Sequence, residues 1–241
     1  MSDASDFISD LLEIDTLKTW SLIVTLFGDL ESDRISGAQI RTLLGHTGIK
    51  PEAIRVALHR LKNDGWVNVE KEGRDAYYSL SRLGSQETAN AAGDVYRMTP
   101  KYDEPPQFAL TPPGSQIETL PEVWKGVVLV PAGQKLPPQH YALSVSNGIV
   151  PDWLEQAIVS AKVLQSADRL SRVVKRINVS DHEVSSEHKQ VLRLLVLHFW
   201  RRVALRAESW LHMALIPDGA IANCHRPVSI FLGNTESIKV S

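Results

Sequence analysis

Apolar positions recur at helical spacing along much of the chain and predict where its helices lie. In Met1–Asp15, apolar residues alternate with acids in a pattern that predicts a short amphipathic helix. Thr16–Gly28 repeats its apolar residues at a similar spacing and predicts a second helix. Ser36 is expected to open a third helix, because Gln39 three residues later completes a capping box. That helix should end at one of the glycines that follow.

The stretch from Pro51 to Leu80 predicts a helix, a tight stop and a two-stranded hairpin. Pro51 suits the first helical turn, because the N–H that proline lacks would have no partner there. Gly65 is expected to end the helix, since glycine adopts the left-handed conformation without steric cost. Two strand-like runs follow, the first from Trp66, joined by a polar turn at Gly73. A helix followed directly by a small hairpin forms the second half of a winged helix-turn-helix.

Proline spacing changes the pattern in the middle of the chain. Nine of the thirteen prolines lie within residues 99–138, and a helix does not run through such spacing. Short apolar runs predict strands at Phe108–Leu110, Val127–Val130 and His140–Val145. A helix is expected on each side, over Ser81–Met98 and from Pro151 to about Leu164.

The remainder of the chain is predicted to be helical. Ala167–Ile177 is amphipathic, and Ser186 is expected to cap a long helix that reaches about Glu208. The fold class expected is therefore α+β. The expected division is an acidic segment (residues 1–15), a winged helix-turn-helix DNA-binding domain (16–82), a connecting helix (83–98), a small α+β central domain (99–165) and a helical C-terminal domain (166–241).

The distribution of charge favours a regulator with a specific site. The formal net charge of the 241 residues is −2, and residues 1–15 hold five acids and no base. Residues 16–82 hold ten Lys and Arg against eight acids, and the remainder is nearly neutral. A weakly basic module on an acidic chain fits site-specific binding better than general coating of nucleic acid.

Cysteine usage and hydropathy indicate a cytoplasmic protein. Cys224 is the single cysteine, so the chain can form no internal disulfide and a reducing compartment is expected. The acidic N-terminus is unlike a secretory or transit signal. No apolar run approaches the roughly 20 residues that a membrane-spanning helix needs, so no membrane partner is expected.

The outward face of the helix that begins at Pro51 carries candidate DNA contacts. Arginine can bind two acceptors on a guanine edge, asparagine can pair with adenine, and an exposed valine can meet a thymine methyl group. Lysines and an arginine on the hairpin turn suit phosphates, which fix register. The candidates are Lys50, Arg55, Val56, His59, Arg60, Lys62, Asn63 and Arg74. The alternative is a merely solvated helix face; the adjoining hairpin favours the interface.

The sequence does not favour a catalytic or metal-binding site. His182, Glu183, Glu187 and His188 are close in sequence but lack a metal-binding spacing, and a polar loop explains them more simply. Cys224 and His225 are adjacent, and a buried thiol is the simpler interpretation. No nucleophile elbow, phosphate-binding loop or dinucleotide fingerprint occurs in the sequence. We therefore expect no enzyme activity, no cofactor and no metal.

A second group of basic residues lies near the end of the predicted long helix. His198, Arg202 and Arg206 share a face at a spacing of four, and Arg201 sits beside them. Arginines hold phosphates or carboxylates through paired N–H donors, so these four residues are candidate effector ligands. The alternative is that they pair with acids such as Glu208 or face water.

Several motifs together resemble one family of regulators. They are Leu26-Phe27-Gly28-Asp29, Ala53 to Leu61 with Asp64-Gly65-Trp66, Gly73-Arg74 with Tyr77-Tyr78-Ser79-Leu80, and Leu194 to Arg202. This combination is similar to the PaaX-type family, repressors of phenylacetic acid degradation genes. The resemblance implies a dimeric repressor that binds an inverted repeat in double-stranded DNA and is released by an aryl-CoA thioester, hence an acyl-CoA effector. The sequence departs from the family pattern over Tyr96–Trp124, where members carry a longer central domain.

A different class of function remains open at this point. A winged-helix module could bind another protein and not DNA. The low net charge and the acids Glu52, Glu70 and Glu72 near the proposed DNA face favour that alternative. Steep salt dependence of DNA binding would exclude it.

Overall fold

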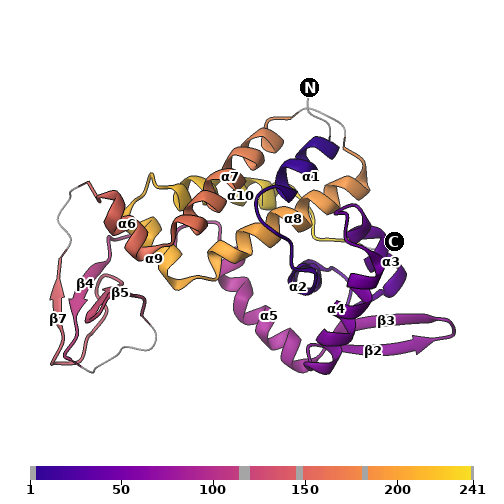
Figure 1. Ribbon diagram of the computed structural model, residues 1–241, viewed down its shortest axis with the longest axis horizontal. Coiled ribbons are helices and arrows are strands. Elements are labelled where there is room, and N and C mark those ends of the chain that lie inside the picture. Colours follow the sequence, from indigo (N-terminus) through magenta and orange to yellow (C-terminus); the bar gives the residue numbers. More distant parts are fainter. Residues whose placement is uncertain (1–3, 114–119, 145–148, 181–183, 240–241) are drawn as a thin grey trace.

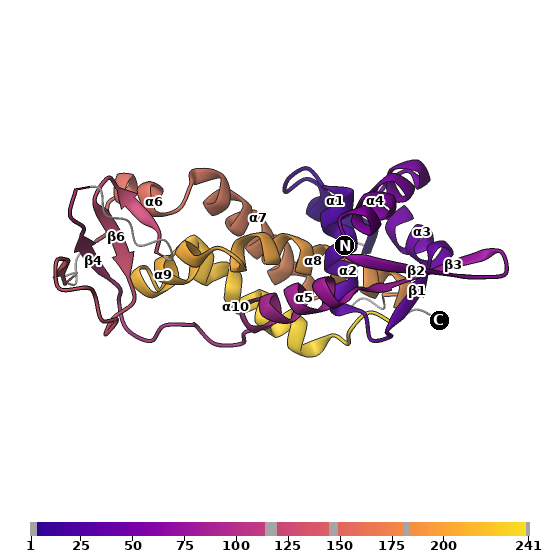
Figure 2. The same cartoon turned by 90° about the horizontal axis from the view of Figure 1, so that it is seen from below.

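The computed structural model describes residues 4–113, 120–144, 149–180 and 184–239. Within them the chain forms ten helices and two small antiparallel sheets, which make an elongated α+β molecule (Figures 1 and 2). The elements are α1 (Ala4–Leu12), α2 (Thr19–Asp29), β1 (Arg34–Ser36), α3 (Gly37–Gly45), α4 (Pro51–Asn63), β2 (Val67–Glu72), β3 (Asp75–Leu80), α5 (Arg82–Val95), β4 (Gln107–Leu110), β5 (Glu122–Trp124), β6 (Val127–Val130), β7 (Tyr141–Leu143), α6 (Asp152–Ile158), α7 (Ala161–Asn178), α8 (Ser186–Ala204), α9 (Ala207–Leu215) and α10 (Ala220–Asn234).

Three helices and a three-stranded sheet occupy one end of the molecule. Helix α2 packs against α4, and the strand order β1-β3-β2 places β3 at the centre of the sheet and β2 at one edge. In Figures 1 and 2 the β2–β3 hairpin projects away from the rest of the chain. Helix α4 buries Ile54, Ala57, Leu58 and Leu61, which lie at helical spacing, so its opposite face points to solvent.

The end of α4 fixes where the hairpin starts. The Trp66 N–H donates to the Leu61 carbonyl at 2.8 Å and the Gly65 N–H donates to the Lys62 carbonyl at 3.1 Å. This is a Schellman motif, and it requires the left-handed φ of +74° that Gly65 adopts. Gly73 likewise takes a φ of +63° in the two-residue turn between Glu72 and Asp75. The predicted helix, stop and hairpin are therefore confirmed.

Two further predictions for this end hold, and one strand was missed. Ser36 and Gln39 form the expected capping box, and α3 ends at Gly45. Strand β1 pairs with β3 through Ile35 opposite Tyr78, and the sequence did not indicate it. Its three residues contain one apolar position, which is too little pattern to identify a strand; the pairing with β3 supplies its backbone partners.

The second sheet lies at the opposite end of the molecule (Figure 1). Its strand order is β5-β6-β4-β7, all antiparallel. The runs Phe108–Leu110 and Val127–Val130 were predicted as strands, and β4 and β6 confirm them. Strand β7 confirms part of His140–Val145, of which Val145 lies outside the described residues. Strand β5 was not predicted.

The helix predicted from Pro151 to about Leu164 was wrong in its extent. The helix expected from Pro151 to Leu164 is divided, because Val159 and Ser160 take extended conformations between α6 and α7. Val159 is β-branched and buried, which favours an extended backbone at that point. Helix α7 then continues to Asn178, so the boundary expected between residues 165 and 166 falls inside it.

The long helix α8 also differs from expectation at both ends. Ser185 and not Ser186 caps it, accepting the His188 N–H at 3.3 Å. It ends at Ala204 and not near Glu208, because the Trp210 indole N–H donates to the Ala204 carbonyl at 2.8 Å and the chain turns into α9. A side-chain contact of this kind has no signature in the spacing of apolar residues.

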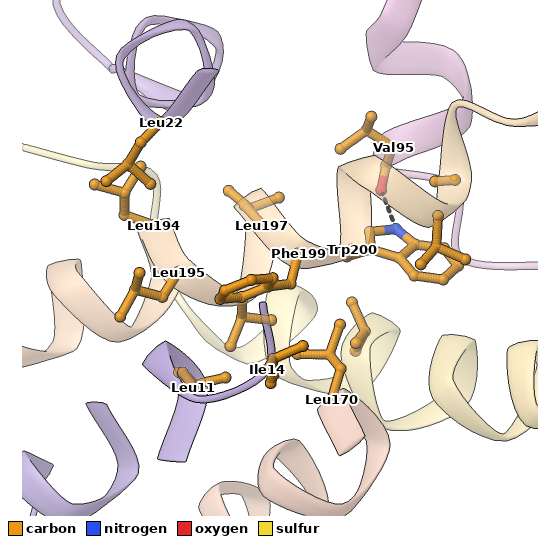
Figure 3. Packing of buried hydrophobic residues seen from close by; sticks show 14 of the residues in the cluster. Leu11, Ile14, Leu22, Val95, Leu170, Leu194, Leu195, Leu197, Phe199 and Trp200 are labelled. Atoms are coloured by element: carbon orange, nitrogen blue, oxygen red, sulfur yellow. Dashed lines mark hydrogen bonds between the residues drawn. The ribbon is translucent and has the colours of Figure 1, made fainter. Parts of the chain in front are cut away.

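Helix α8 is the centre of the hydrophobic core. Figure 3 shows its Leu194, Leu195 and Phe199 between Leu22 of α2 and the N-terminal residues Leu11 and Ile14. The Trp200 indole also donates to the Val95 carbonyl at 2.9 Å, which ties α8 to the end of α5. One continuous cluster of buried side chains therefore joins the N-terminal elements to the C-terminal helices. No helix in the described part of the chain is long and apolar enough to span a membrane.

Candidate nucleic-acid interface and ligand cleft

All eight predicted DNA contacts are exposed at the end of the molecule that carries the hairpin. Six of them lie on α4, Lys50 immediately precedes that helix, and Arg74 occupies the hairpin turn. Val56 is 63% exposed, although valine usually packs in a core. The amphipathic pattern of α4 explains this arrangement, since burial of its apolar stripe turns the polar and basic positions outward.

Some of these side chains are already engaged with one another. Arg60 forms an ion pair with Asp64 at 3.4 Å, and the Asn63 amide lies 3.3 Å from Nδ1 of His59. Both pairs span one helical turn at the surface, where such contacts stabilise little and exchange readily. Among the described residues, no acid lies within ion-pair distance of the other basic candidates, which are Lys50, Arg55, Lys62 and Arg74. These four cations are available to an anionic partner.

Strand β1, which pairs with β3 of the hairpin, carries a further basic residue that is not among the eight candidates. Arg34 of β1 forms an ion pair with Glu72 near the end of β2, and its guanidinium lies 4.6 Å from the centre of the Tyr77 ring. Glu72 was one of the three acids that favoured an interface without DNA. Because Arg34 neutralises it, Glu72 opposes a polyanion less than its position in the sequence indicated. Only the pairing of β1 with β3 could have revealed this contact.

The four candidate effector residues surround one cavity. His198, Arg201, Arg202 and Arg206 line a space of about 250 Å³ together with Ser21 of α2 and Leu205. Arg206 lies beyond the end of α8, so it reaches the cavity from the link to α9 and not from the helix face that the spacing predicted. An adjoining cavity of about 160 Å³ shares Arg202 and Arg206 with the first.

The side chains of this cleft differ in their burial, their charge and the partners that they already have. His198 is 1% exposed; burial, with Arg202 and Arg201 nearby, lowers its pKa to about 4, so the ring is neutral near pH 7. The Arg201 guanidinium donates to Oγ1 of Thr25 at 3.1 Å, and burial lowers its pKa without discharging it. Arg206 pairs with Glu208 at 3.3 Å, as the alternative interpretation expected.

The other histidine, glutamate and cysteine residues considered for catalysis or metal binding make structural contacts where the structure describes them. His182 and Glu183 lie outside the described residues, while Glu187 pairs with His46, which follows the end of α3, at 2.9 Å. Cys224 is fully buried, and burial raises the pKa of its thiol, which agrees with the interpretation of an inert core residue. In the part of the chain that the structure describes, no group of three or more metal-ligating side chains comes together.

Comparisons with known proteins agree with the family resemblance. Residues 18–84, which run from just before α2 to the start of α5, match the family model described as PaaX-like protein. Over 245 residues the chain is 28% identical to the transcriptional repressor PaaX of Escherichia coli (strain K12), with 86% of this chain and 77% of that one covered. The resemblance to the PaaX-type family is confirmed. The relative is by its name a regulator, in line with the expectation that this chain is not an enzyme.

Proposed function

From this similarity to a PaaX-type repressor we propose that the protein is a transcription regulator that binds specific sites in double-stranded DNA. The single observation that carries the proposal is the exposed basic face of α4 beside the projecting hairpin. It lies within residues 18–84, the segment that matches the family model. Duplex DNA is a dense polyanion, so unpaired cations on the exposed face of α4 and on the hairpin turn supply both affinity and orientation.

We propose that this end of the molecule is a winged helix-turn-helix. The order α2, β1, α3, α4, β2, β3 supports it, because α3 and α4 are joined by a short turn and the hairpin follows α4 at once. In that arrangement α4 is the recognition helix in the major groove and the hairpin is the wing. The corresponding division of the chain, with a DNA-binding domain over residues 16–82, belongs to the same proposal.

Each exposed side chain then has a role that its chemistry suits. Arg55 and Arg60 would read guanine, Asn63 adenine, and Val56 a thymine methyl group. His59 lies between them on the same face of α4 and would contact a base edge or a phosphate. The cations Lys50, Lys62 and Arg74 would contact phosphates on either side and fix the register. Lys71, exposed on β2, extends that phosphate-binding surface along the hairpin.

We further propose a dimeric, cytoplasmic repressor that recognises an inverted repeat and responds to a small molecule. The relative's name supports repression. The cleft around Arg201 and Arg202 supports a ligand with phosphate or carboxylate groups, because guanidinium groups bind such anions through paired donors. An aryl-CoA thioester, the effector that the resemblance implies, carries several phosphates and fits this chemistry.

The second candidate function is a winged-helix module that binds a protein and not DNA. Glu52 and Glu70 favour it, since both are exposed near the basic face. Glu72 supports it less, because of its pairing with Arg34. The two candidates differ in the sign of the partner's charge, and hence in how salt affects binding.

A gel-shift titration tests the proposal. The full chain would be titrated onto the promoter regions that flank its own gene, at two salt concentrations, with and without aryl-CoA thioesters. We expect tight binding that weakens steeply with salt and that one thioester abolishes. Binding that no thioester affects would keep the regulator and remove the effector. Absence of binding at low salt to every flanking region would favour the protein-interaction module.

A further inference from the structure

Asp15 connects the N-terminal segment to two helices near the C-terminal end of the chain. It lies between α1 and α2, and its Oδ2 accepts from Nζ of Lys162 on α7 at 3.0 Å and from a guanidinium nitrogen of Arg202 on α8 at 2.7 Å. Its Oδ1 accepts the N–H of Thr16 at 2.8 Å. The side chain is 14% exposed. One carboxylate therefore occupies the space between two cations that come from different helices.

This carboxylate lies at the wall of the basic cleft. The cavity of about 160 Å³ is lined by Asp15, Lys162, Arg202 and Arg206, and it adjoins the cavity that Arg201 also lines. Of the five charged side chains around the two cavities, Asp15 alone is an acid. Arg206 has a second acid, Glu208, as its own partner. Positive charge therefore exceeds negative charge across the cleft, and Asp15 offsets part of it.

We propose that Asp15 is an internal counter-ion of this cleft, and that the phosphate or carboxylate of a bound ligand displaces it from Lys162 and Arg202. The proposal rests on the ligand cleft of the proposed function and names the step by which the ligand acts. Both anions offer oxygens that accept from the same donors, so they compete for one position. An internal competitor is present at high effective concentration and lowers the affinity for the ligand.

The displacement would break a direct link between the segment that precedes α2 and the helices α7 and α8. Asp15 stands four residues before α2, and α2 packs against both α4 and α8. While Asp15 holds Lys162 and Arg202, the segment that enters α2 is tied to α7 and α8. A ligand that takes its place removes this tie at the entry to α2, while the packing of α2 against α4 and α8 remains. The pKa of Asp15 is lowered to about 2, because hydrogen bonds from Lys162, Thr16 and Arg202 outweigh the opposing effect of burial, so the group is charged near neutral pH.

Binding of inorganic pyrophosphate to the full chain tests the displacement. Isothermal titration calorimetry would compare the wild type with Asp15→Asn, which keeps the size of the side chain and removes its charge. We expect Asp15→Asn to bind pyrophosphate about tenfold more tightly, within the usual range of such couplings. Asp10→Asn is the matched control, because Asp10 joins α1 to Arg176 of α7 at 2.5 Å and lines neither cavity. It should bind as the wild type does.

Other outcomes of the same titration separate this proposal from the proposed function. Equal or weaker binding by Asp15→Asn would overturn the role as counter-ion, while loss of binding in Arg202→Gln would still support the cleft. If no protein binds pyrophosphate, both the counter-ion and the ligand cleft are wrong. Gel shifts on the same preparations test DNA binding independently of either result.

A measurement on the wild type alone avoids any effect of substitution on folding. The Thr16 amide donates to Asp15, so displacement of the carboxylate should remove that hydrogen bond. We expect hydrogen–deuterium exchange at Thr16 to become faster when pyrophosphate is added at saturation. Unchanged or slower exchange at Thr16, with pyrophosphate bound, would contradict the displacement.

Discussion

Asp29 and Arg193 form a buried, two-pronged ion pair across 164 positions of sequence. Arg193 Nε donates to Oδ2 of Asp29 at 2.6 Å, and a terminal guanidinium nitrogen donates to Oδ1 at 2.7 Å. The side chain of Arg193 is 6% exposed and that of Asp29 is 1% exposed. Tyr96 donates to the same carboxylate at 3.0 Å, and Arg193 also donates to the Thr235 carbonyl at 2.8 Å. The last residue of α2 is thereby joined to α8 and to the segments that end α5 and α10.

Removal of one member of this pair should destabilise the protein strongly. In Asp29→Ala the Arg193 guanidinium stays buried without its carboxylate, and we expect a loss of about 3–5 kcal/mol in the free energy of unfolding. Urea denaturation followed by tryptophan fluorescence measures it. Asp168→Ala is the control, since Asp168 pairs with Arg172 at the surface of α7 and should cost less than about 1 kcal/mol. Equal losses in the two variants would show that the buried ion pair contributes no more to stability than the surface ion pair.

Two glycines of α5 should respond oppositely to alanine. A Cβ at Gly84 would overlap the carbonyl oxygen of Trp66, where α5 packs on the start of the hairpin, whereas Gly93 has nothing within 4 Å of such an atom. Gly84→Ala should therefore lose about 1–3 kcal/mol of stability through overpacking. Gly93→Ala should gain up to about 1 kcal/mol through helix propensity. Thermal denaturation of both variants checks the signs; stabilisation by Gly84→Ala would contradict the close contact.

Base-reading and phosphate-binding cations should differ in sequence dependence. Arg55→Ala is expected to cost about 1–3 kcal/mol on the best operator and less on variants with a changed base, if Arg55 reads that base. Arg74→Ala should weaken binding about equally on all sequences and reduce the slope of log affinity against log salt by about one. Fluorescence anisotropy titrations at several salt concentrations measure both quantities. Arg172→Ala, on the surface of α7, serves as the control and should change neither.

The response to a ligand should depend on Arg202 more than DNA binding does. Arg202 lines both cavities, whereas the residues proposed to contact DNA lie on α4, immediately before it and on the hairpin turn. We therefore expect the Arg202→Ala variant to require a higher concentration of aryl-CoA thioester than the wild type for release of operator DNA. Its affinity for DNA without thioester should be unchanged. Gel shifts with a titration of thioester measure the two effects separately. An equal loss of DNA binding would point to a role of Arg202 in folding.

Stability should fall as the pH decreases from 6.5 toward 4. The pKa of His198 is lowered to about 4 by burial and by Arg202 and Arg201, while an unfolded histidine titrates near 6.5. The unfolded state therefore binds a proton first, and the stabilisation present above pH 6.5 is lost as the pH falls through this window. The pKa values of His212 and His225 are also lowered by burial and act in the same direction.

The variant His198→Gln isolates the contribution of that ring. It should flatten the dependence of unfolding free energy on pH between 6.5 and 4, and leave the part due to the other two histidines. Urea denaturation at pH 7, 6 and 5 measures the slope. A slope identical to that of the wild type would mean that His198 does not titrate with a lowered pKa in the folded protein.

The sequence alone determined most of the helices of this protein and which side chains of α4 are exposed. Apolar spacing identified the buried stripe of α4, and Gly65 and Gly73 marked its end and the hairpin turn. These features were readable because they arise from neighbours within a few residues, where helix periodicity and glycine conformation act directly. The exposed residues of α4 follow from the same pattern, because positions outside the buried stripe face solvent.

Only the tertiary structure decided which charged groups meet. Nothing near Asp29 or Asp15 in the sequence indicates Arg193, Lys162 or Arg202 as partners. The neutralisation of Glu72 by Arg34 likewise depends on a contact between segments that are remote in the sequence. Such pairings are fixed when helices pack around a common core, because side-chain electrostatics act through space and leave no periodic signal along the chain.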